Sequence, residues 1–226
     1  MSRLHYGILA SGLMILLNTS PLEAMLIFRA GYLSQTLSVS EGYNKFLSER
    51  YGAKSPRLSG TALSAAFWGI GRWAIGMELD DLSGSIKYKT LNGDNQENKM
   101  KLQNTMVFLA FFLGKSARLE VDVGYGSNKL TREFYGYQDY HITTSNISSQ
   151  VGTQESSTKG SIQMLQILYR FLGTTFSIEA GGRYSMNKHQ IPSSDPRPGY
   201  DSKGIPTDLD FNLGGLGLIG TVTYRF

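Results

Sequence analysis

The sequence predicts an all-β fold, an eight-stranded antiparallel up-and-down transmembrane β-barrel with short periplasmic turns and long extracellular loops. Three observations support this prediction. Apolar and polar residues alternate with a period of two in segment after segment, which is typical of strands with one apolar face. Short glycine turns alternate with long polar connections. Aromatic residues gather beside the short turns and at the C-terminus, as they do where a membrane meets water.

The first 24 residues are interpreted as a secretory signal peptide. Arg3 and His5 precede an apolar run at 8–17, and the segment ends on Ala24, a small residue after which cleavage is plausible. A buried N-terminal helix is the alternative, although the apolar run is too short to span a bilayer. Residues 25–226 are then expected to form a single outer-membrane β-barrel domain.

Eight segments carry the period-two pattern. In the first of them, Leu26 and Phe28 share one face and Arg29 lies on the other. Two segments are less regular, because 59–69 contains small residues throughout and 105–113 is apolar on both faces. Taken alone, either of these two could be a buried strand or a helix. The predicted strands are 25–38, 59–69, 72–90, 98–113, 117–131, 159–172, 174–189 and 209–226.

The connections between these strands alternate in length. Turns near Gly71, Gly114 and Gly173 are short, whereas the other connections are long and polar. The long connections are expected at 39–58, 91–97, 132–158 and 190–208. Aromatic residues beside the short turns are expected to meet at one rim and form an interfacial girdle. These interfacial aromatics are Trp68, Trp73, Phe111, Phe171 and Phe176.

The last strand ends on an aromatic residue, Phe226, with Val222 and Tyr224 on the same face. In its strand pattern and this terminus, the chain resembles the small eight-stranded outer-membrane β-barrels of the OmpA/OmpX type. The resemblance covers about residues 25–226 and is one of pattern rather than of a specific motif. It implies that Val222, Tyr224 and Phe226 belong to an assembly signal read by the barrel-assembly machinery. It also implies that the exported chain resides in the cell outer membrane.

The polar faces of the strands carry charges that would point into the barrel. Eight strands leave an interior only wide enough for side chains, so these charges are expected to neutralise one another. All five cations are arginines, which fork onto carboxylates and are weakly hydrated. A structural filling is preferred over a proton or ion path, because a plugged interior conducts poorly. The expected network contains Arg29, Glu78, Asp80, Arg118, Glu120, Asp122, Arg170, Glu179, Arg183 and Arg225.

Several kinds of chemistry have little support in the sequence. The absence of cysteine excludes a thiolate metal site and a cysteine nucleophile, and the charge of +4 requires no nucleic-acid partner. The pattern from Gly215 to Gly220 formally matches a dinucleotide fingerprint. That fingerprint needs a following helix, but the last residues alternate as a strand. No cofactor, metal or catalytic residue is therefore expected.

The expected function is structural, or a surface interaction through the long loops, without catalysis. The expected partners are outer-membrane lipids and lipopolysaccharide, the assembly machinery and an extracellular ligand of loops 39–58 and 132–158; a monomer is expected. One alternative is a lipid A-modifying hydrolase that uses His141 with Ser145 or Ser148. Another is a soluble periplasmic barrel that carries an apolar ligand and turns its apolar faces inward.

Overall fold

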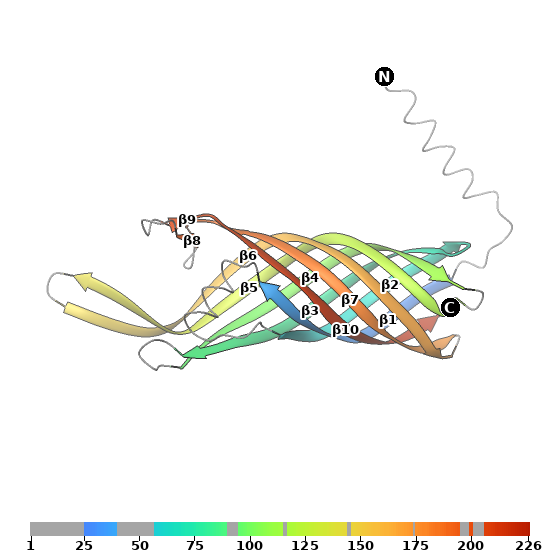
Figure 1. Ribbon diagram of the computed structural model, residues 1–226, viewed down its shortest axis with the longest axis horizontal. Coiled ribbons are helices and arrows are strands. Elements are labelled where there is room, and N and C mark those ends of the chain that lie inside the picture. Colours follow the sequence, from blue (N-terminus) through green and yellow to red (C-terminus); the bar gives the residue numbers. More distant parts are fainter. Residues whose placement is uncertain are drawn as a thin grey trace, which may run out of the picture.

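Eight long antiparallel strands close into a barrel (Figure 1). The structure is a computed structural model that describes residues 25–39, 57–89, 95–114, 117–143, 146–173, 175–194, 199–200 and 206–226. Each strand pairs with its sequence neighbours, and β1 closes the barrel by pairing with β10. The wall strands are β1 Met25–Val39, β2 Arg57–Ile70, β3 Trp73–Lys89, β4 Asn95–Leu113, β5 Leu119–Thr143, β6 Asn146–Leu172, β7 Phe176–Ile191 and β10 Leu209–Arg225.

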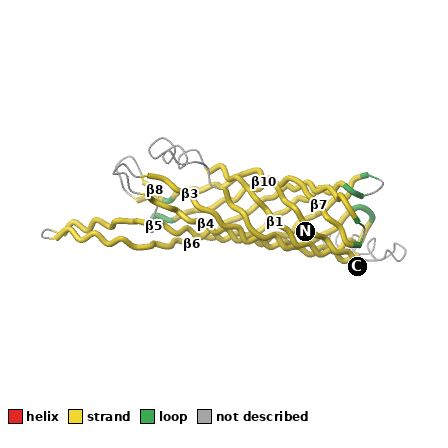
Figure 2. Tube along the Cα trace, turned by 90° about the horizontal axis from the view of Figure 1, so that it is seen from below, coloured by secondary structure: helices red, strands yellow, loops and turns green. Residues whose placement is uncertain are grey.

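The predicted all-β barrel is therefore confirmed. Strands make up nearly all of the described chain in Figure 2, and among the described residues no helix is long and apolar enough to cross a membrane. The segments 59–69 and 105–113, whose pattern was ambiguous, lie in β2 and β4. The pattern from Gly215 to Gly220 lies in β10, so no helix follows it. The predicted signal peptide, residues 1–24, lies outside the described residues.

Closure holds the C-terminus in place. The register pairs Arg29 with Thr223 and Tyr32 with Gly220. The Phe226 amide donates a hydrogen bond of 3.0 Å to the Leu26 carbonyl oxygen. A strand that ends on an aromatic residue is thus paired on both edges, by β1 and by β7.

Glycine allows the three short connections to turn tightly. Gly71, Gly114 and Gly173 have φ angles of 57°, 78° and 79°, a region that residues with a Cβ rarely adopt. These turns join β2 to β3, β4 to β5 and β6 to β7 at one end of the barrel. The opposite end carries the long connections, where β8 Gly199–Tyr200 and β9 Pro206–Thr207 form a small separate hairpin.

The connection predicted at 132–158 is mostly strand, which corrects the loop prediction. β5 continues to Thr143 and β6 begins at Asn146, so the two strands form a ribbon that extends beyond the barrel (Figure 1). Tyr137 pairs with Gly152, and a register shift lies between Phe134 and Tyr137. The segment lacks proline and is rich in threonine, tyrosine and isoleucine, which favour strands.

Candidate functional site: the filled lumen and the outer wall

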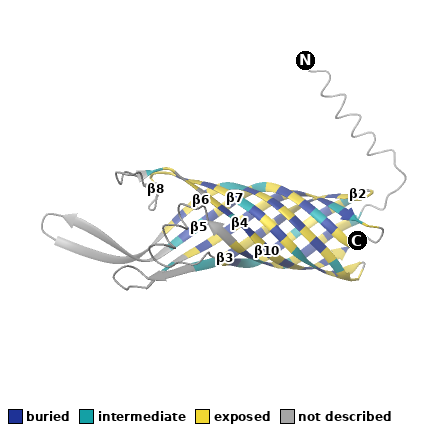
Figure 3. Cartoon of the chain, in the orientation of Figure 1, coloured by how far each residue is buried: buried dark blue, intermediate teal, exposed yellow. Residues whose placement is uncertain are grey.

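Alternation along each strand decides which side chains fill the lumen. Buried and exposed residues form a checkerboard on the barrel wall (Figure 3). In β7, Ser177 and Glu179 are each 1% exposed, whereas Phe176 and Ile178 are 61% and 47% exposed. The lumen therefore receives one residue in two, and these inward residues include the buried Arg29, Glu78, Asp80, Glu120, Asp122, Arg132, Glu179, Arg183 and Arg225.

Glu179 is the centre of the ion-pair cluster nearer the short turns. Its carboxylate lies 3.3 Å from Arg29 Nε and 3.4 Å from Arg170 Nε, and it also accepts a hydrogen bond from Arg225. Thr223 Oγ1 donates a further hydrogen bond of 2.9 Å. One carboxylate thus joins arginines from β1, β6 and β10 across the barrel interior.

Arg29 extends this cluster to β5. Its Nη2 donates to both carboxylate oxygens of Glu120, at 2.5 and 2.7 Å. Its Nη1 lies 3.8 Å from Asp122 Oδ2. Because Arg29 and Glu120 are each buried, their hydrogen bonds replace the water that both groups lose.

Arg183 forms a second cluster, which lies farther from the short turns and closer to the long-loop end of the barrel. Its Nη1 donates a hydrogen bond of 3.0 Å to Asp80 Oδ2, and its Nη2 donates to Glu78. Asn104 Nδ2 also donates to Asp80 Oδ2, at 3.0 Å. Two acidic residues from β3 therefore face one arginine from β7 across the lumen, and all three side chains are buried.

Gln166 joins the two clusters. Its Nε2 donates a hydrogen bond of 2.8 Å to Asp122, and its Oε1 accepts one of 2.8 Å from Arg183 Nε. The result is a continuous network that includes residues of β1, β3, β4, β5, β6, β7 and β10. Strand β2 contributes Ala62 and Ala66 at its inward positions, which leaves room for the long side chains opposite.

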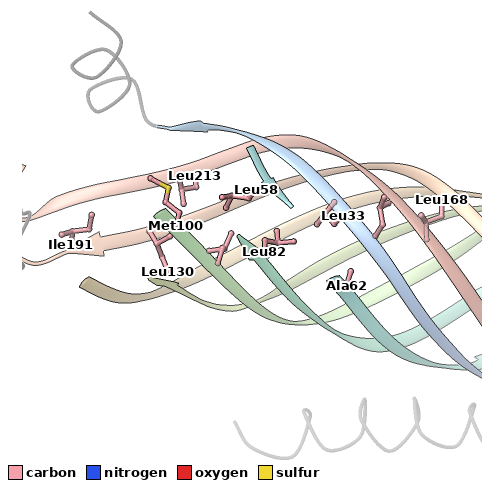
Figure 4. Close-up of a cluster of buried hydrophobic side chains, with 11 residues drawn as sticks. Leu33, Leu58, Ala62, Leu82, Met100, Leu130, Leu168, Ile191 and Leu213 are labelled. Carbon is pink, nitrogen blue, oxygen red and sulfur yellow. The ribbon is translucent and has the colours of Figure 1, made fainter. Parts of the chain in front are cut away.

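Apolar layers accompany the network, so the lumen is not wholly polar as predicted. Figure 4 shows Leu33, Leu58 and Leu82 pointing into the interior. A second cluster contains the buried Phe108 and Phe112, which come from a segment with apolar residues on both faces. Eight strands enclose a space of fixed width, and bulky side chains fill it wherever charged pairs do not.

Two predicted positions are wrong. Arg118 lies in the turn before β5 begins at Leu119, and it is exposed rather than part of the lumen. Trp68 does not belong to the outward girdle, because its position in β2 has the inward phase. It stacks on the buried Phe112 with ring centroids 4.3 Å apart, and its Nε1 donates to the Gly71 carbonyl oxygen. The indole thus covers the end of the lumen at the short turns.

The other predicted aromatic residues lie at the short-turn rim. Trp73, Phe171 and Phe176 are 54%, 55% and 61% exposed, and the half-buried Phe111 packs on Trp73 with ring centroids 4.5 Å apart. Val222, Tyr224 and Phe226 occupy the outer face of the terminal strand. The structure thus provides an aromatic girdle at one edge of an apolar wall.

The outer wall is apolar at the same height along the barrel as the charged network inside it. Ile75 and Met77 of β3, for example, are 54% and 56% exposed on the opposite face from Glu78. On the outer face, large apolar residues continue along the strands as far as Tyr32, Tyr125 and Tyr184, beyond which most outward positions are polar. We call this zone the apolar band. Its outward apolar side chains contradict the soluble-carrier alternative.

Sequence reasoning missed Arg132, Gln166 and His189 as lumen residues. All three are buried. Arg132 donates a hydrogen bond of 3.0 Å to Ser156. Arg132 has the same even-numbered phase as Glu120 and Asp122, so extending the alternation past residue 131 would have found it. The uncharged Gln166 offered no comparable signal.

Some predicted functional residues lie wholly or partly outside the described residues. The backbone of His141 pairs with Ser148 in the β5–β6 ribbon, but the side chains there lie outside the described residues. Within loop 39–58, residues 40–56 also lie outside the described residues.

Comparisons with known proteins establish the fold. No protein-family model matches the chain, and no curated protein matches it either. The crystal structure of Ail, the attachment invasion locus protein of Yersinia pestis, matches with a TM-score of 0.52 and 13% identity over 91% of this chain and 100% of Ail. Ail in complex with the heparin analogue sucrose octasulfate gives a TM-score of 0.50, 12% identity and the same coverage. OprG of Pseudomonas aeruginosa matches with a TM-score of 0.48 and 14% identity over 90% of this chain and 96% of OprG. The chain has the fold of the small eight-stranded outer-membrane β-barrels of Gram-negative bacteria.

Proposed function

We propose that this outer-membrane barrel is a closed, non-catalytic scaffold that presents its long-loop end, above all the β5–β6 ribbon, at the cell surface. The observation that carries the proposal is the continuous network from Arg29 to Arg183 through Gln166. Charged pairs and apolar side chains occupy the lumen together, which favours a membrane anchor over a pore. Outer-membrane lipids and lipopolysaccharide are the proposed surroundings of the apolar band, and the proposed state is a monomer.

A planar-bilayer experiment tests the closed lumen. The refolded barrel is expected to show no stepwise conductance above that of the bilayer alone, because buried ion pairs would have to separate before ions could pass. Reproducible open steps of porin size from folded protein would contradict the proposal. A heat-unfolded sample is the control for leakage caused by the detergent.

Surface labelling tests which end of the barrel faces outward. The chain has no cysteine, so Ser148→Cys in the ribbon and Arg118→Cys at a short turn each offer a single reactive thiol. A membrane-impermeant maleimide is expected to label Ser148→Cys on intact cells and Arg118→Cys only after the outer membrane is permeabilised. Labelling of Arg118→Cys alone on intact cells would overturn the orientation.

The lipid A hydrolase alternative has one point in its favour and one against it. The backbones of His141 and Ser148 pair directly, so the two residues are neighbours in the ribbon. However, His141 lies about 50 Å along β5 from Tyr125 at the edge of the apolar band, too far to reach an acyl chain in the membrane. Mass spectrometry of lipid A from cells with and without His141→Ala is expected to show identical acyl chains, and a change in acylation would revive the alternative.

A further inference from the structure

The β5–β6 ribbon leaves the barrel with two strand edges that no neighbour covers. β5 pairs with β4 as far as Tyr135, and β6 pairs with β7 as far as Gly160, whereas the pairing between β5 and β6 continues to Thr143 and Asn146. Figures 1 and 2 both show the end of the ribbon beyond every other described strand. Within the described part of the chain, no strand therefore pairs with the two edges of the ribbon beyond these positions.

The two edges of the ribbon differ in how they are protected. Natural proteins keep exposed edges from pairing by a bulge, a proline or a charged residue. A register shift places an extra residue of β5 between Phe134 and Tyr137, which is a bulge, and β5 also carries Asp139. Residues 146–154 of β6 pair regularly beyond the bulge and contain neither proline nor a charged residue. We call residues 146–154 of β6 the ribbon edge.

The ribbon edge offers backbone hydrogen bonds to a further strand. In an antiparallel pair, alternate residues direct their N–H and C=O groups to the partner strand, and the residues between them direct theirs away from it. About half of the ribbon edge therefore presents backbone groups that β5 does not pair, over a length of about 30 Å. A two-stranded ribbon alone is only marginally stable in water, and further strands stabilise it. The partner that fits this edge is another extended strand.

A second copy of the ribbon edge meets these requirements. Joining two ribbon edges gives a four-stranded sheet, with β5 and β6 of one copy followed by β6 and β5 of the other. Both outer edges of that sheet are then β5 edges, which the bulge and Asp139 protect. Because the ribbon edge carries no charged residue, its pairing with a second ribbon edge brings no like charges together in any register. Both copies contribute the same surface, as in a two-fold symmetric contact.

The direction of the strands determines how two barrels can meet. Ribbons that stand on the same membrane point the same way, so their β6 strands would run parallel. Antiparallel pairing, which is the more stable per residue, requires ribbons that point toward each other from two membranes. The ribbon extends from the long-loop end, so this arrangement places the two barrels on facing surfaces (Figure 1). Each barrel remains a monomer in its own membrane.

We propose that the ribbon edge pairs with the ribbon edge of a second copy on a facing membrane and so joins two cell surfaces. This inference rests on the proposed orientation of the barrel and adds to it a partner and a binding mode. One such edge contact is small for a stable complex of two proteins. Many copies on each membrane act together, so the two surfaces adhere although each single contact is weak.

Clustering of lipid vesicles that contain the folded, full-length barrel tests the self-association. Light scattering measures the mean hydrodynamic radius, which is expected to be severalfold larger for wild-type vesicles than for protein-free vesicles. Ser149→Lys/Val151→Lys puts like charges into the ribbon edge of both copies, so the vesicles are expected to stay separate. Gln138→Lys/Tyr140→Lys is the matched control, because it adds the same charges at the paired positions of β5. The control vesicles are expected to cluster like the wild type.

A charge exchange separates self-association from misfolding and from other partners. Vesicles with Ser149→Glu/Val151→Glu are also expected to stay separate, because like charges again meet between the copies. A mixture of these vesicles with those of the double-lysine variant is expected to cluster, because opposite charges then meet. Recovery in the mixture shows that both variants fold and that the copies bind each other.

Four results would overturn the proposal: no clustering of wild-type vesicles, unchanged clustering in the double-lysine variant, equal losses in that variant and the β5 control, or no recovery in the mixture. Equal clustering of wild-type vesicles with protein-free vesicles would also overturn it and would assign the ribbon edge to a membrane contact. If Ser148→Cys is labelled on intact cells and on the vesicle exterior while wild-type vesicles stay separate, self-association fails but the proposed orientation stands.

Discussion

Gln166 donates a hydrogen bond of 2.8 Å to Asp122, and this contact connects two ion-pair clusters that otherwise lie apart in the lumen. The other end of the same amide accepts from Arg183. An amide can do this because it carries both a donor and an acceptor, whereas a carboxylate would offer acceptors alone. The barrel interior is thus held together by an uncharged side chain as well as by charged ones.

Replacing Gln166 with leucine tests this bridge. Gln166→Leu leaves a carboxylate oxygen of Asp122 and a guanidinium nitrogen of Arg183 without these partners in a buried site. The free energy of unfolding is expected to fall by about 1–3 kcal/mol. Urea titration of the barrel in lipid vesicles measures this change. Gln163→Leu, on the outward face of the same strand, is the matched control and is expected to be nearly neutral.

Arg183 is expected to be the most sensitive charged residue of the lumen. Arg183→Met removes the cation that faces Glu78 and Asp80, so two buried carboxylates lose their ion-pair partner. The expected loss is about 3–5 kcal/mol of unfolding free energy. Adding Glu78→Gln to Arg183→Met should recover part of the loss, because one uncompensated charge disappears.

The same urea titrations supply the control for Arg183. Arg118→Met removes an exposed arginine from a turn and is expected to change the unfolding free energy by no more than about 0.5 kcal/mol. Equal losses in Arg183→Met and Arg118→Met would show that the lumen network contributes nothing specific to stability.

Gly76 lets the β3 backbone approach the lumen filling closely. A Cβ at this position would lie 2.5 Å from Phe108 Cζ and 2.6 Å from the Ala65 carbonyl oxygen. Gly76→Ala is therefore expected to cost about 1–3 kcal/mol through overpacking. Gly220→Ala serves as the comparison, since its added methyl group meets no atom within 4 Å on the lipid-facing wall. A Gly76→Ala barrel as stable as the Gly220→Ala barrel in urea would contradict the packing described.

Phe226 is expected to matter for assembly more than for the final fold. Its ring packs edge-on against Phe28 and Tyr224, with centroids 5.7 and 4.5 Å apart, and it remains 64% exposed. Phe226→Ala should lower the amount of heat-modifiable barrel in outer membranes severalfold while refolding in micelles is retained. Phe171→Ala, which removes another exposed aromatic of the same rim, is expected to leave the amount unchanged. Equal losses in both variants would assign Phe226 to the girdle rather than to an assembly signal.

The side chains that face the lumen could be predicted because successive residues of a strand point to opposite faces. Once the charged face is placed inside, every other residue of the strand is placed as well. Glu120 and Leu119, for example, lie on opposite faces as expected. Positions next to turns were harder to predict. Arg118 has the inward phase, but its strand begins one residue later, so its side chain faces water.

The partners within the lumen could not be read from the sequence. Arg183 and Glu78 are 105 residues apart and meet only because closure and tilt bring β3 and β7 across from each other. The same holds for Lys129 and Lys159 on the outer wall, whose pairing depends on the register of β5 with β6. Composition predicts which groups are charged, and register decides which of them meet.

Spin-label accessibility along β10 in lipid vesicles tests the central claim most directly, namely that alternate side chains face hydrocarbon and a filled interior. Single cysteines at each position from Leu218 to Tyr224 can carry the label, because the native chain has none. Collision with dissolved oxygen is predicted to be high at Leu218, Gly220, Val222 and Tyr224 and low at the three residues between them. Equal accessibility at all seven positions, or the opposite phase, would contradict the account.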